Sequence, residues 1–307
     1  DGSAFPWKNG RQLASWTKNG QTTSYTYNAD GLRTKKVNPD GSWSEYHWIG
    51  STLISENRFR ANGERHWTLQ FQYDQNGSPV GVSFRDCGES TFTYVYYYAK
   101  NLQGDIVGLY KRNPDGTGAQ VIATYDYDPW GKVTAVRDAN GALVTYPSAS
   151  NLIAFMNPLR YRGYYQDNDT GFYYLQSRYY DPELKRFINA DSYSSTGQGF
   201  LGHNMFAYCG NNPTTNYDPN GTRAVMYPAD ILAGGELDKS ASGGSSVFGT
   251  IAENAWESIC TVYKHLEIDL GVGQGLYGSL GSLGFIPLEG GFRGDYVHIK
   301  IDKGNFR

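Results

Sequence analysis

Residues 157–221 read NPLRYRGYYQDNDTGFYYLQSRYYDPELKRFINADSYSSTGQGFLGHNMFAYCGNNPTTNYDPNG, and this stretch decides how the chain is organised. Three tyrosine pairs alternate with Asp-Pro, Gly and Asn residues, and the stretch ends on Asp218-Pro219-Asn220-Gly221. Because Pro, Gly, Asn and Asp favour turns, the pattern indicates short strands joined by tight turns. The sequence before it is repetitive, and the sequence after it has a different composition.

The composition is that of a β-rich protein. The 307 residues, 39% of them hydrophobic, suffice for one large or two ordinary domains. The 26 Tyr, 14 Phe and 38 Gly favour strands and turns over helices. Residues 1–221 carry 20 Lys and Arg against 20 Asp and Glu, so no basic surface for nucleic acid is indicated.

The cysteines and the first residues carry further information. Three widely spaced cysteines without a C-x-x-C pair predict neither a disulfide framework nor a metal site, and no cofactor motif is matched. The chain has no initiating Met, signal peptide or stop-transfer run, and it begins within a repetitive pattern. We therefore expect it to be a fragment or processed product of a longer protein.

A loose unit recurs upstream of residue 157. It reads YTYNADG at 25–31, FQYDQNG at 71–77 and YDYDPWG at 125–131, with a weaker copy leading into 101–105. Alternating strands joined by Asn-Gly and Asp-Gly turns predict a ribbon of β-hairpins. Because tyrosine and glycine recur together, we expect the copies to stack on their neighbours, with an ordinary β-sandwich as the alternative.

Four segments carry a resemblance to a known family. YDPWGKV at 127–133, RYRGYY at 160–165, TGFYYLQSRYYDPELKRFINAD at 170–191 and NMFAYCGNNPTTNYDPNG at 204–221 resemble the Rhs/YD-repeat proteins and their Rhs-associated core domain. The resemblance covers about residues 20–221. It implies a mainly β fold, in which a hairpin ribbon forms part of a spiralling shell, with a small α+β C-terminal segment. The implied domains are repeats at 1–156, a core at 157–221 and a variable segment at 222–307.

The same resemblance implies a function. The chain would be the C-terminal part of a secreted bacterial Rhs-type polymorphic toxin, located outside the cell or at its surface, whose shell encloses and delivers the C-terminal segment. Its partners would be the upstream remainder of the shell, an immunity protein and a secretion apparatus. One alternative is a cell-surface adhesive or carbohydrate-binding module whose tyrosines stack on glycans. Another is an enzyme domain in the tail, with the repeats as a stalk.

The core stretch concentrates charged and phenolic side chains. Arginine pairs with carboxylates and stacks on tyrosine rings, so these residues predict a buried network that closes one end of the β-structure rather than a ligand site. The candidate residues are Arg160, Arg162, Tyr165, Arg178, Tyr180, Asp181 and Asp191.

Asp218 has a sharper interpretation. In the family that the chain resembles, an Asp-Pro-x-Gly motif contributes an aspartate to a self-cleaving site that releases the C-terminal segment, with a second aspartate downstream. Two carboxylates that share a proton can act as acid and base. Asp218 fits the first half, and Asp230 is the nearby candidate for the second. Thr222 stands where the family pattern usually has Leu, and the alternative is a turn that only marks a domain boundary.

The tail predicts one helix, one linker and one strand. Thr250 and Glu253 have capping-box spacing, and the apolar positions that follow predict a helix ending at Gly271, after a flexible linker at 240–246. Residues 270–288 carry no charge, and their glycines favour a packed loop over a membrane span. Residues 295–302 predict a strand.

Speculative effector residues in the tail are His265, Glu267, Asp295 and His298. A cluster of histidines and carboxylates can serve as acid and base or hold a metal, although solvated polar residues are the commoner interpretation.

Overall fold

The computed structural model describes residues 2–92, 94–114, 118–150, 152–191 and 204–227, and the backbone of two strands, 266–272 and 295–301. Contacts divide the chain into two compact units, Asp1–Lys239 and Ser240–Arg307. The functional boundary between residues 221 and 222 stays a prediction. Among the described residues no helix is long and apolar enough to cross a membrane.

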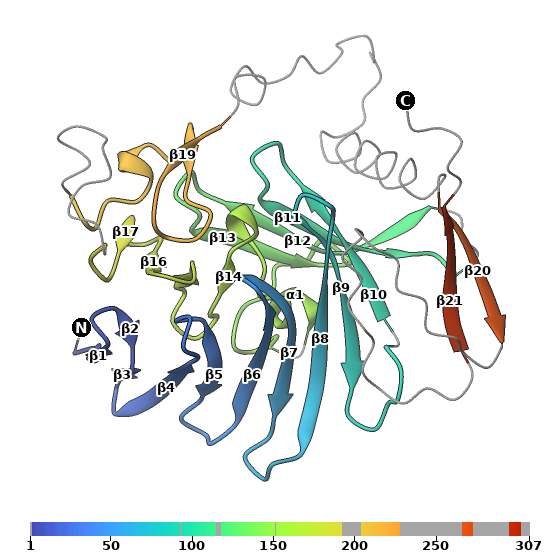
Figure 1. Ribbon diagram of the computed structural model, residues 1–307, viewed down its shortest axis with the longest axis horizontal. Coiled ribbons are helices and arrows are strands. Elements are labelled where there is room, and N and C mark those ends of the chain that lie inside the picture. Colours follow the sequence, from blue (N-terminus) through green and yellow to red (C-terminus); the bar gives the residue numbers. More distant parts are fainter. Residues whose placement is uncertain are drawn as a thin grey trace. The chain divides into compact units, whose positions relative to one another are not determined.

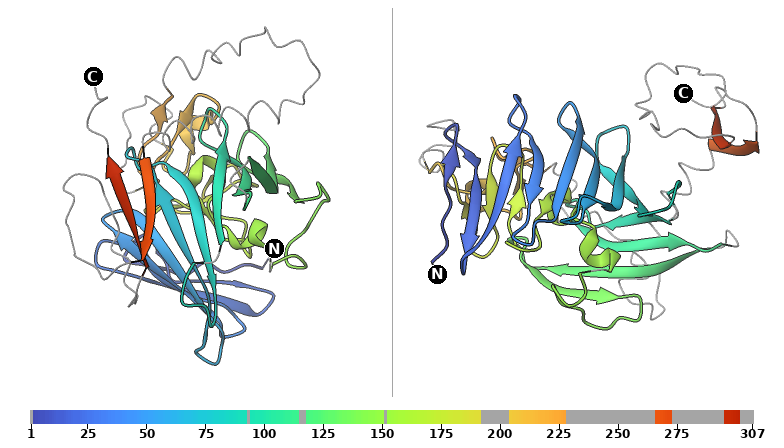
Figure 2. Two further views of the ribbon diagram at one scale, coloured as in Figure 1. Left: turned by 90° about the vertical axis from the view of Figure 1, so that its right-hand side faces the viewer. Right: turned by 90° about the horizontal axis from the view of Figure 1, so that it is seen from below.

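The first unit is built on one antiparallel sheet of eleven strands (Figure 1). Each strand pairs with the next one along the chain, and two further views show the same succession of hairpins (Figure 2). The predicted mainly β hairpin ribbon is thus confirmed. In chain order the strands are β3 (Ser15–Lys18), β4 (Gln21–Tyr27), β5 (Arg33–Val37), β6 (Trp43–Ile49), β7 (Thr52–Phe59), β8 (Arg65–Tyr73), β9 (Pro79–Asp86), β10 (Tyr94–Lys100), β11 (Ile106–Arg112), β12 (Ala119–Tyr127) and β13 (Val133–Asp138). A small hairpin precedes them, formed by β1 (Trp7–Lys8) and β2 (Gln12–Leu13).

The recurring sequence unit is a turn of one kind, which we name the YD turn: Tyr, then Asp or Asn, two further residues and Gly, at 27–31, 73–77 and 127–131. In the second copy Asp74 Oδ1 accepts the backbone N–H groups of Asn76 and Ser78, each at 2.9 Å. Gly77 closes the turn at φ +76°, a conformation that glycine adopts without steric cost. The recurring Asp and Gly are therefore determined by turn geometry.

The tyrosine of each YD turn connects its hairpin to an earlier strand. The strand register shifts by one residue at Tyr27, Tyr73 and Tyr127, which is a β-bulge. Each hydroxyl then donates to a backbone carbonyl of an earlier strand, at 3.0, 2.7 and 2.7 Å. The repeated tyrosine thus ties each hairpin to the chain that precedes it.

A compact segment, residues 153–191, packs against one face of the sheet, and we name it the plug. Figure 1 shows the sheet curving round it. The plug contains α1 (Ile153–Met156), the 3-10 helix η1 (Tyr161–Gly163), β14 (Tyr165–Gln166), β15 (Tyr173–Tyr174), β16 (Tyr179–Asp181) and β17 (Arg186–Phe187). It is followed by the 3-10 helix η3 (Cys209–Asn211), β18 (Asn216–Tyr217) and β19 (Val225–Met226).

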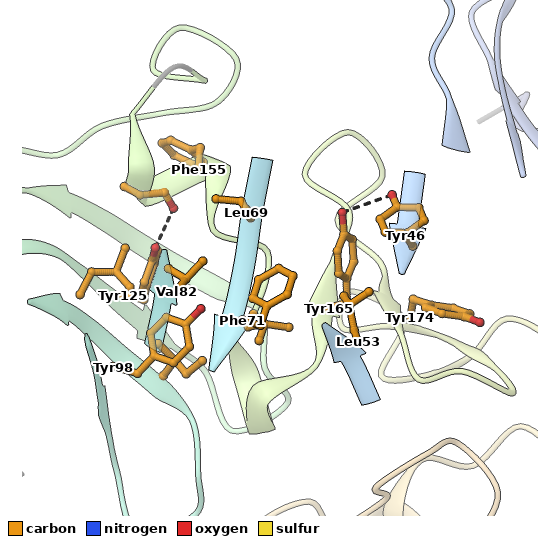
Figure 3. Close-up of a cluster of buried hydrophobic side chains, with 14 of the residues drawn as sticks. Tyr46, Leu53, Leu69, Phe71, Val82, Tyr98, Tyr125, Phe155, Tyr165 and Tyr174 are labelled. Atoms are coloured by element: carbon orange, nitrogen blue, oxygen red, sulfur yellow. Dashed lines mark hydrogen bonds between the residues drawn. The ribbon is translucent and has the colours of Figure 1, made fainter. Parts of the chain in front are cut away.

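Sheet and plug share one hydrophobic core (Figure 3). Leu69, Phe71 and Val82 of the sheet are fully buried beside Phe155 of the plug. Tyrosine hydroxyls cross the junction: that of Tyr125 donates to the Ala154 carbonyl at 2.8 Å. Burial of this many rings stabilises the junction, because apolar surface leaves water and hydroxyls such as those of Tyr98 and Tyr125 keep a hydrogen-bond partner.

In the second unit, the prediction of a helix is wrong for its C-terminal part, which is a strand. Residues Leu266–Val272 form strand β20, which pairs antiparallel with β21 (Asp295–Ile301). The sequence LEIDLGV alternates apolar and polar residues with a period of two, and pairing with a partner strand overrides the local helical spacing. The predicted strand at 295–302 is confirmed for Asp295–Ile301. The predicted linker and the start of the predicted helix lie outside the described residues.

Candidate functional site

The turn at 217–221 brings a buried carboxylate together with a buried guanidinium and several backbone N–H groups. Oδ1 of Asp218 accepts the backbone N–H groups of Gly221, Thr222 and Arg223 at 2.9, 3.0 and 3.2 Å. The predicted Asp-Pro turn is therefore present. Gly221 has φ +76°, and a Cβ there would lie 2.8 Å from Ser177 Oγ, so only glycine fits.

Asp218 is buried, with 1% of its surface exposed. Its Oδ2 lies 3.2 Å from Nη2 of Arg178, whose Nη1 lies 3.0 Å from Asp191. Burial raises the pKa of the Asp218 carboxyl above its ordinary value of 3.8, against the opposing effect of Arg178 and of the backbone N–H groups. The carboxyl can therefore hold a proton more readily than an exposed aspartate.

The carbonyl groups of the turn are also held by side chains. The Gly221 carbonyl oxygen accepts hydrogen bonds from Arg178 Nε and, at 2.6 Å, from Ser177 Oγ. The Asn220 carbonyl accepts the Ser177 backbone N–H at 3.2 Å. On the other side of the peptide bond, Thr222 Oγ1 donates to Asn220 Oδ1 at 2.6 Å. The Gly221–Thr222 bond thus has its oxygen, its nitrogen and a neighbouring hydroxyl in fixed positions.

A pocket of ≈ 360 Å³ opens beside this bond. It lies between the first hairpin, the first YD turn and the turn at 217–221. Its lining residues are Asn9, Arg11, Gln12, Tyr27, Ala29, Asp30, Gly31, Leu32, Gln176, Ser177, Tyr179, Asn220 and Thr222. Because amides, hydroxyls and charged groups predominate in this lining, the pocket can hold water next to Thr222.

The three predicted arginines lie in three separate sites rather than in one network. The Arg160 guanidinium lies 4.8 Å from the Tyr125 ring and donates to the Ala154 carbonyl at 2.8 Å. Arg162 pairs with Asp105 at 2.7 Å. Only Arg178 reaches the turn that ends the core. Each arginine therefore fixes a different part of the plug.

The remaining predicted core residues are mostly structural. The Tyr165 hydroxyl donates to Glu56 at 2.9 Å, and Tyr180 stacks on Tyr208 at a ring distance of 4.0 Å. The sequence predicts Asp181 in the arginine network, whereas in the structure it accepts the backbone N–H groups of its own turn, at 2.8 and 3.2 Å. Its position directly before Pro182 favours this local role.

Sequence reasoning missed a cluster of charges built round the buried side chains of Arg33, Lys36 and Asp167. Arg33 pairs with Asp167 at 2.6 Å, and Lys36 lies 3.1 Å from Asp167 and 2.6 Å from Asp169. Five tyrosine rings surround the Arg33 guanidinium, at 4.7 to 6.0 Å: those of Tyr25, Tyr46, Tyr165, Tyr174 and Tyr179. The run RTKK resembles an exposed strand, and only contacts with the distant plug show otherwise.

Several predicted residues cannot be assigned to a site. Asp230 and His265 lie outside the described residues. In the paired strands of the second unit, Glu267 is opposite Lys300, and Asp295 is opposite Val272. His298 is opposite Asp269. Within the described ranges of the chain, no group of three His, Cys, Asp or Glu side chains is arranged to hold a metal.

Comparison with known proteins gives consistent findings. A model of the RHS repeat matches residues 7–42. The chain is 30% identical over 220 residues to the tRNA nuclease WapA of Bacillus subtilis, which is 71% of this chain and 8% of WapA. It is 32% identical over 164 residues to the uncharacterised protein YibJ of Escherichia coli, covering 48% of this chain and 68% of YibJ.

A solved structure shares the fold. One chain of the Photorhabdus luminescens Tc holotoxin pore, determined with a TccC3 mutant, matches with a TM-score of 0.54 and 20% identity over 75% of this chain and 10% of its own length. The present chain thus spans about a tenth or less of the holotoxin component and of WapA. None of these findings supports the adhesion alternative.

Proposed function

The chain belongs to the RHS repeat family, and we propose that it is the C-terminal part of an Rhs-type toxin whose β-shell encloses and delivers the segment after residue 221. One observation carries the proposal: the plug fills the inner face of an eleven-stranded repeat sheet and is locked to it by buried charges. Because the plug covers part of one face of the sheet, the core between them is separated from solvent.

The buried ion pairs between the sheet and the plug favour the shell over the alternative in which the repeats form a stalk. Arg33 and Lys36 belong to strand β5 and Asp167 to the plug, and all three are buried. A buried ion pair that loses one partner leaves an uncompensated charge, which costs about 3–5 kcal/mol. Separation of the plug from the sheet would therefore leave buried charges without partners, at a large cost in free energy.

Enclosure would protect the producing cell from the effector. The partners we propose are the upstream remainder of the shell, an immunity protein for the effector and a secretion apparatus. The site of action would lie outside the producing cell. The effector chemistry would reside in residues 222–307, with Glu267, Asp295 and His298 as the first residues to substitute.

Growth measurements test the toxin proposal. Expression of residues 1–307 in a bacterial cytoplasm without an immunity protein should reduce plating efficiency strongly. A chain of residues 1–239, which ends at the boundary of the first unit, should not. Equal plating of the two chains at equal soluble expression would overturn the proposal.

A further inference from the structure

Asparagine followed by glycine is the dipeptide in which the backbone nitrogen most readily attacks the side-chain carboxamide, because glycine carries no side chain that shields its nitrogen. The chain contains this dipeptide six times, at 9–10, 19–20, 62–63, 76–77, 140–141 and 220–221. We propose that Asn19 is a site of spontaneous deamidation, and that the fold slows the same reaction at the other copies. The modification is independent of the activity of the tail.

The loop at Asn19 leaves both reacting groups free. Asn19 and Gly20 join β3 to β4, Lys18 pairs with Gln21 across the hairpin, and both loop residues have positive φ, +52° and +76°. Positive φ at both positions is the type I′ turn, in which the flanking residues close the ladder. Both loop residues are exposed. Within the part of the chain that the structure describes, neither the Gly20 N–H nor the Asn19 carboxamide has a hydrogen-bond partner.

Three other copies have their glycine nitrogen tied. In these copies glycine is the last residue of a four-residue turn, and its N–H donates to the carbonyl oxygen of the first residue. The bonds join Gly63 to Arg60 at 2.9 Å, Gly77 to Asp74 at 3.0 Å and Gly141 to Asp138 at 3.0 Å. Attack by the glycine nitrogen breaks the hydrogen bond that closes the turn, so the turn opposes the reaction.

The two remaining copies are each held at one of the reacting groups. At the end of the core, the Gly221 N–H donates to Oδ1 of the buried Asp218 at 2.9 Å. In the first hairpin, the Asn9 amide nitrogen donates to Gln12 Oε1 at 2.9 Å, so the carboxamide must leave this partner before it can react. All six copies lie in the described ranges, and only the loop between β3 and β4 leaves both groups without a partner.

The reaction balances with water as its only co-reactant. A water molecule takes the proton of the Gly20 nitrogen as that nitrogen bonds to Cγ of Asn19, through a five-membered ring that makes the attack intramolecular. The Cγ–Nδ2 bond then breaks, and the side-chain nitrogen leaves as ammonia with the proton that the water returns. A second water molecule opens the resulting succinimide. Opening at Cγ gives aspartate, and opening at the backbone carbonyl gives isoaspartate.

The modified loop lies at an edge of the sheet. β3 is the last strand of the eleven, and the described residues add one bridge beyond it, between Ala4 and Thr17. Isoaspartate inserts an extra carbon into the backbone of a loop whose length sets the register of Lys18 with Gln21. Both products also add a negative charge. Deamidation therefore loosens the edge strand without altering a core side chain.

The test incubates the purified chain of residues 1–307 at mildly alkaline pH in water enriched in oxygen-18, with peptide mass mapping over time. Asn19 should lose ammonia and take up label, and an isoaspartate methyltransferase should methylate the isoaspartate fraction. The rate at Asn19 should exceed that at Asn76 by about fivefold to tenfold, as expected when one reaction must break a hydrogen bond and the other need not. In concentrated urea the two rates should become similar.

Substitutions at the two loops complete the test. Asn19→Gln should abolish the modification at this loop, because the longer side chain has to close a six-membered ring. Asn76→Gln is the matched control and should leave the rate at Asn19 unchanged. An Asn19 that stays intact in the folded chain but reacts in urea would overturn the proposal. Equal rates at Asn19 and Asn76 in the folded chain would overturn it as well.

Discussion

The turns at 127–131 and 217–221 share Tyr, Asp, Pro and Gly at four of five positions, yet they differ in almost every contact. In the first, Asp128 and Lys132 pair through their backbones at 2.9 Å and close a hairpin. In the second, the Asp218 N–H donates to the Tyr164 hydroxyl at 3.1 Å, and the turn lies in a longer loop between the paired strands β18 and β19. The same five-residue motif thus serves as a repeat connection and as the exit from the core.

The groups that donate hydrogen bonds to the glycine carbonyl oxygen also differ between the two turns. The Gly131 oxygen accepts the neutral Tyr173 hydroxyl at 2.7 Å, and Lys132 follows it. The Gly221 oxygen accepts a guanidinium and a serine hydroxyl, and Thr222 follows it. The turn at the end of the core therefore contacts a guanidinium that the turn at 127–131 lacks. We infer that the surroundings of the turn, and not its sequence motif, determine these contacts.

The largest expected effect on stability comes from a steric clash at the glycine that closes each of the two turns. A Cβ at Gly131 would lie 2.4 Å from the Tyr161 ring, at φ +85°. Gly131→Ala should lower the free energy of unfolding by about 3–5 kcal/mol, from overpacking and backbone strain together. Gly77→Ala, at φ +76° with nothing within 4 Å, is the control and should cost about 1 kcal/mol. Urea denaturation measures both, and equal costs would show that the first turn does not pack on the plug.

The next largest effect is expected at Arg33, which pairs with Asp167 of the plug. Arg33→Met should destabilise the first unit by about 2–4 kcal/mol, because Asp167 then keeps only Lys36 as a partner in the core. Arg33→Lys should not restore the stability, since an ammonium cannot reproduce the planar contacts with five tyrosine rings. Thermal unfolding of the two variants is the measurement, and wild-type stability in either one would contradict this assignment.

Replacing Asp128 or Asp218 tests the difference between the two turns more directly. Asp218→Asn should cost about 1–3 kcal/mol, because the buried Arg178 loses one of its two carboxylates. Asp128→Asn should cost about 0.5 kcal/mol, because its carboxyl only accepts backbone N–H groups and asparagine can do the same. Chemical denaturation of both variants at neutral pH checks the order. A larger cost at Asp128 would reverse the comparison.

The effect of pH on stability should be smaller than the effects of these substitutions. It should have opposite signs at the buried carboxylates of Asp167 and Asp218. Burial acts to raise the pKa of Asp167, but Arg33 and Lys36 outweigh it and hold the pKa below 3.8. Its stabilising contribution is thus complete above pH 3.8 and is lost as pH falls through the lower, folded value. For Asp218 the folded pKa is raised, so its ionisation removes stability as pH rises above 3.8. Asp167→Asn should therefore flatten acid unfolding, whereas Asp218→Asn should not.

Much of the fold could be predicted because it depends on local chemistry. The YD turns follow from Asp and Gly at fixed spacing, and the strands follow from period-two alternation. The site was only partly predictable. Asp218 is visible in the sequence, but the donors from Ser177 and Arg178 come from a loop some forty residues earlier. Long-range pairs such as Arg33 with Asp167 leave no local signal, and the strand at Leu266 required its distant partner.

The most direct test of the account is hydrogen exchange at the backbone amides of the plug, measured in the purified chain of residues 1–307 and in its Arg33→Met variant. The account predicts slow exchange in the wild-type plug and faster exchange in the variant, because Arg33 pairs with Asp167 of the plug in the core. Equal exchange rates in the two proteins would contradict the claim that buried charges hold the plug on the sheet.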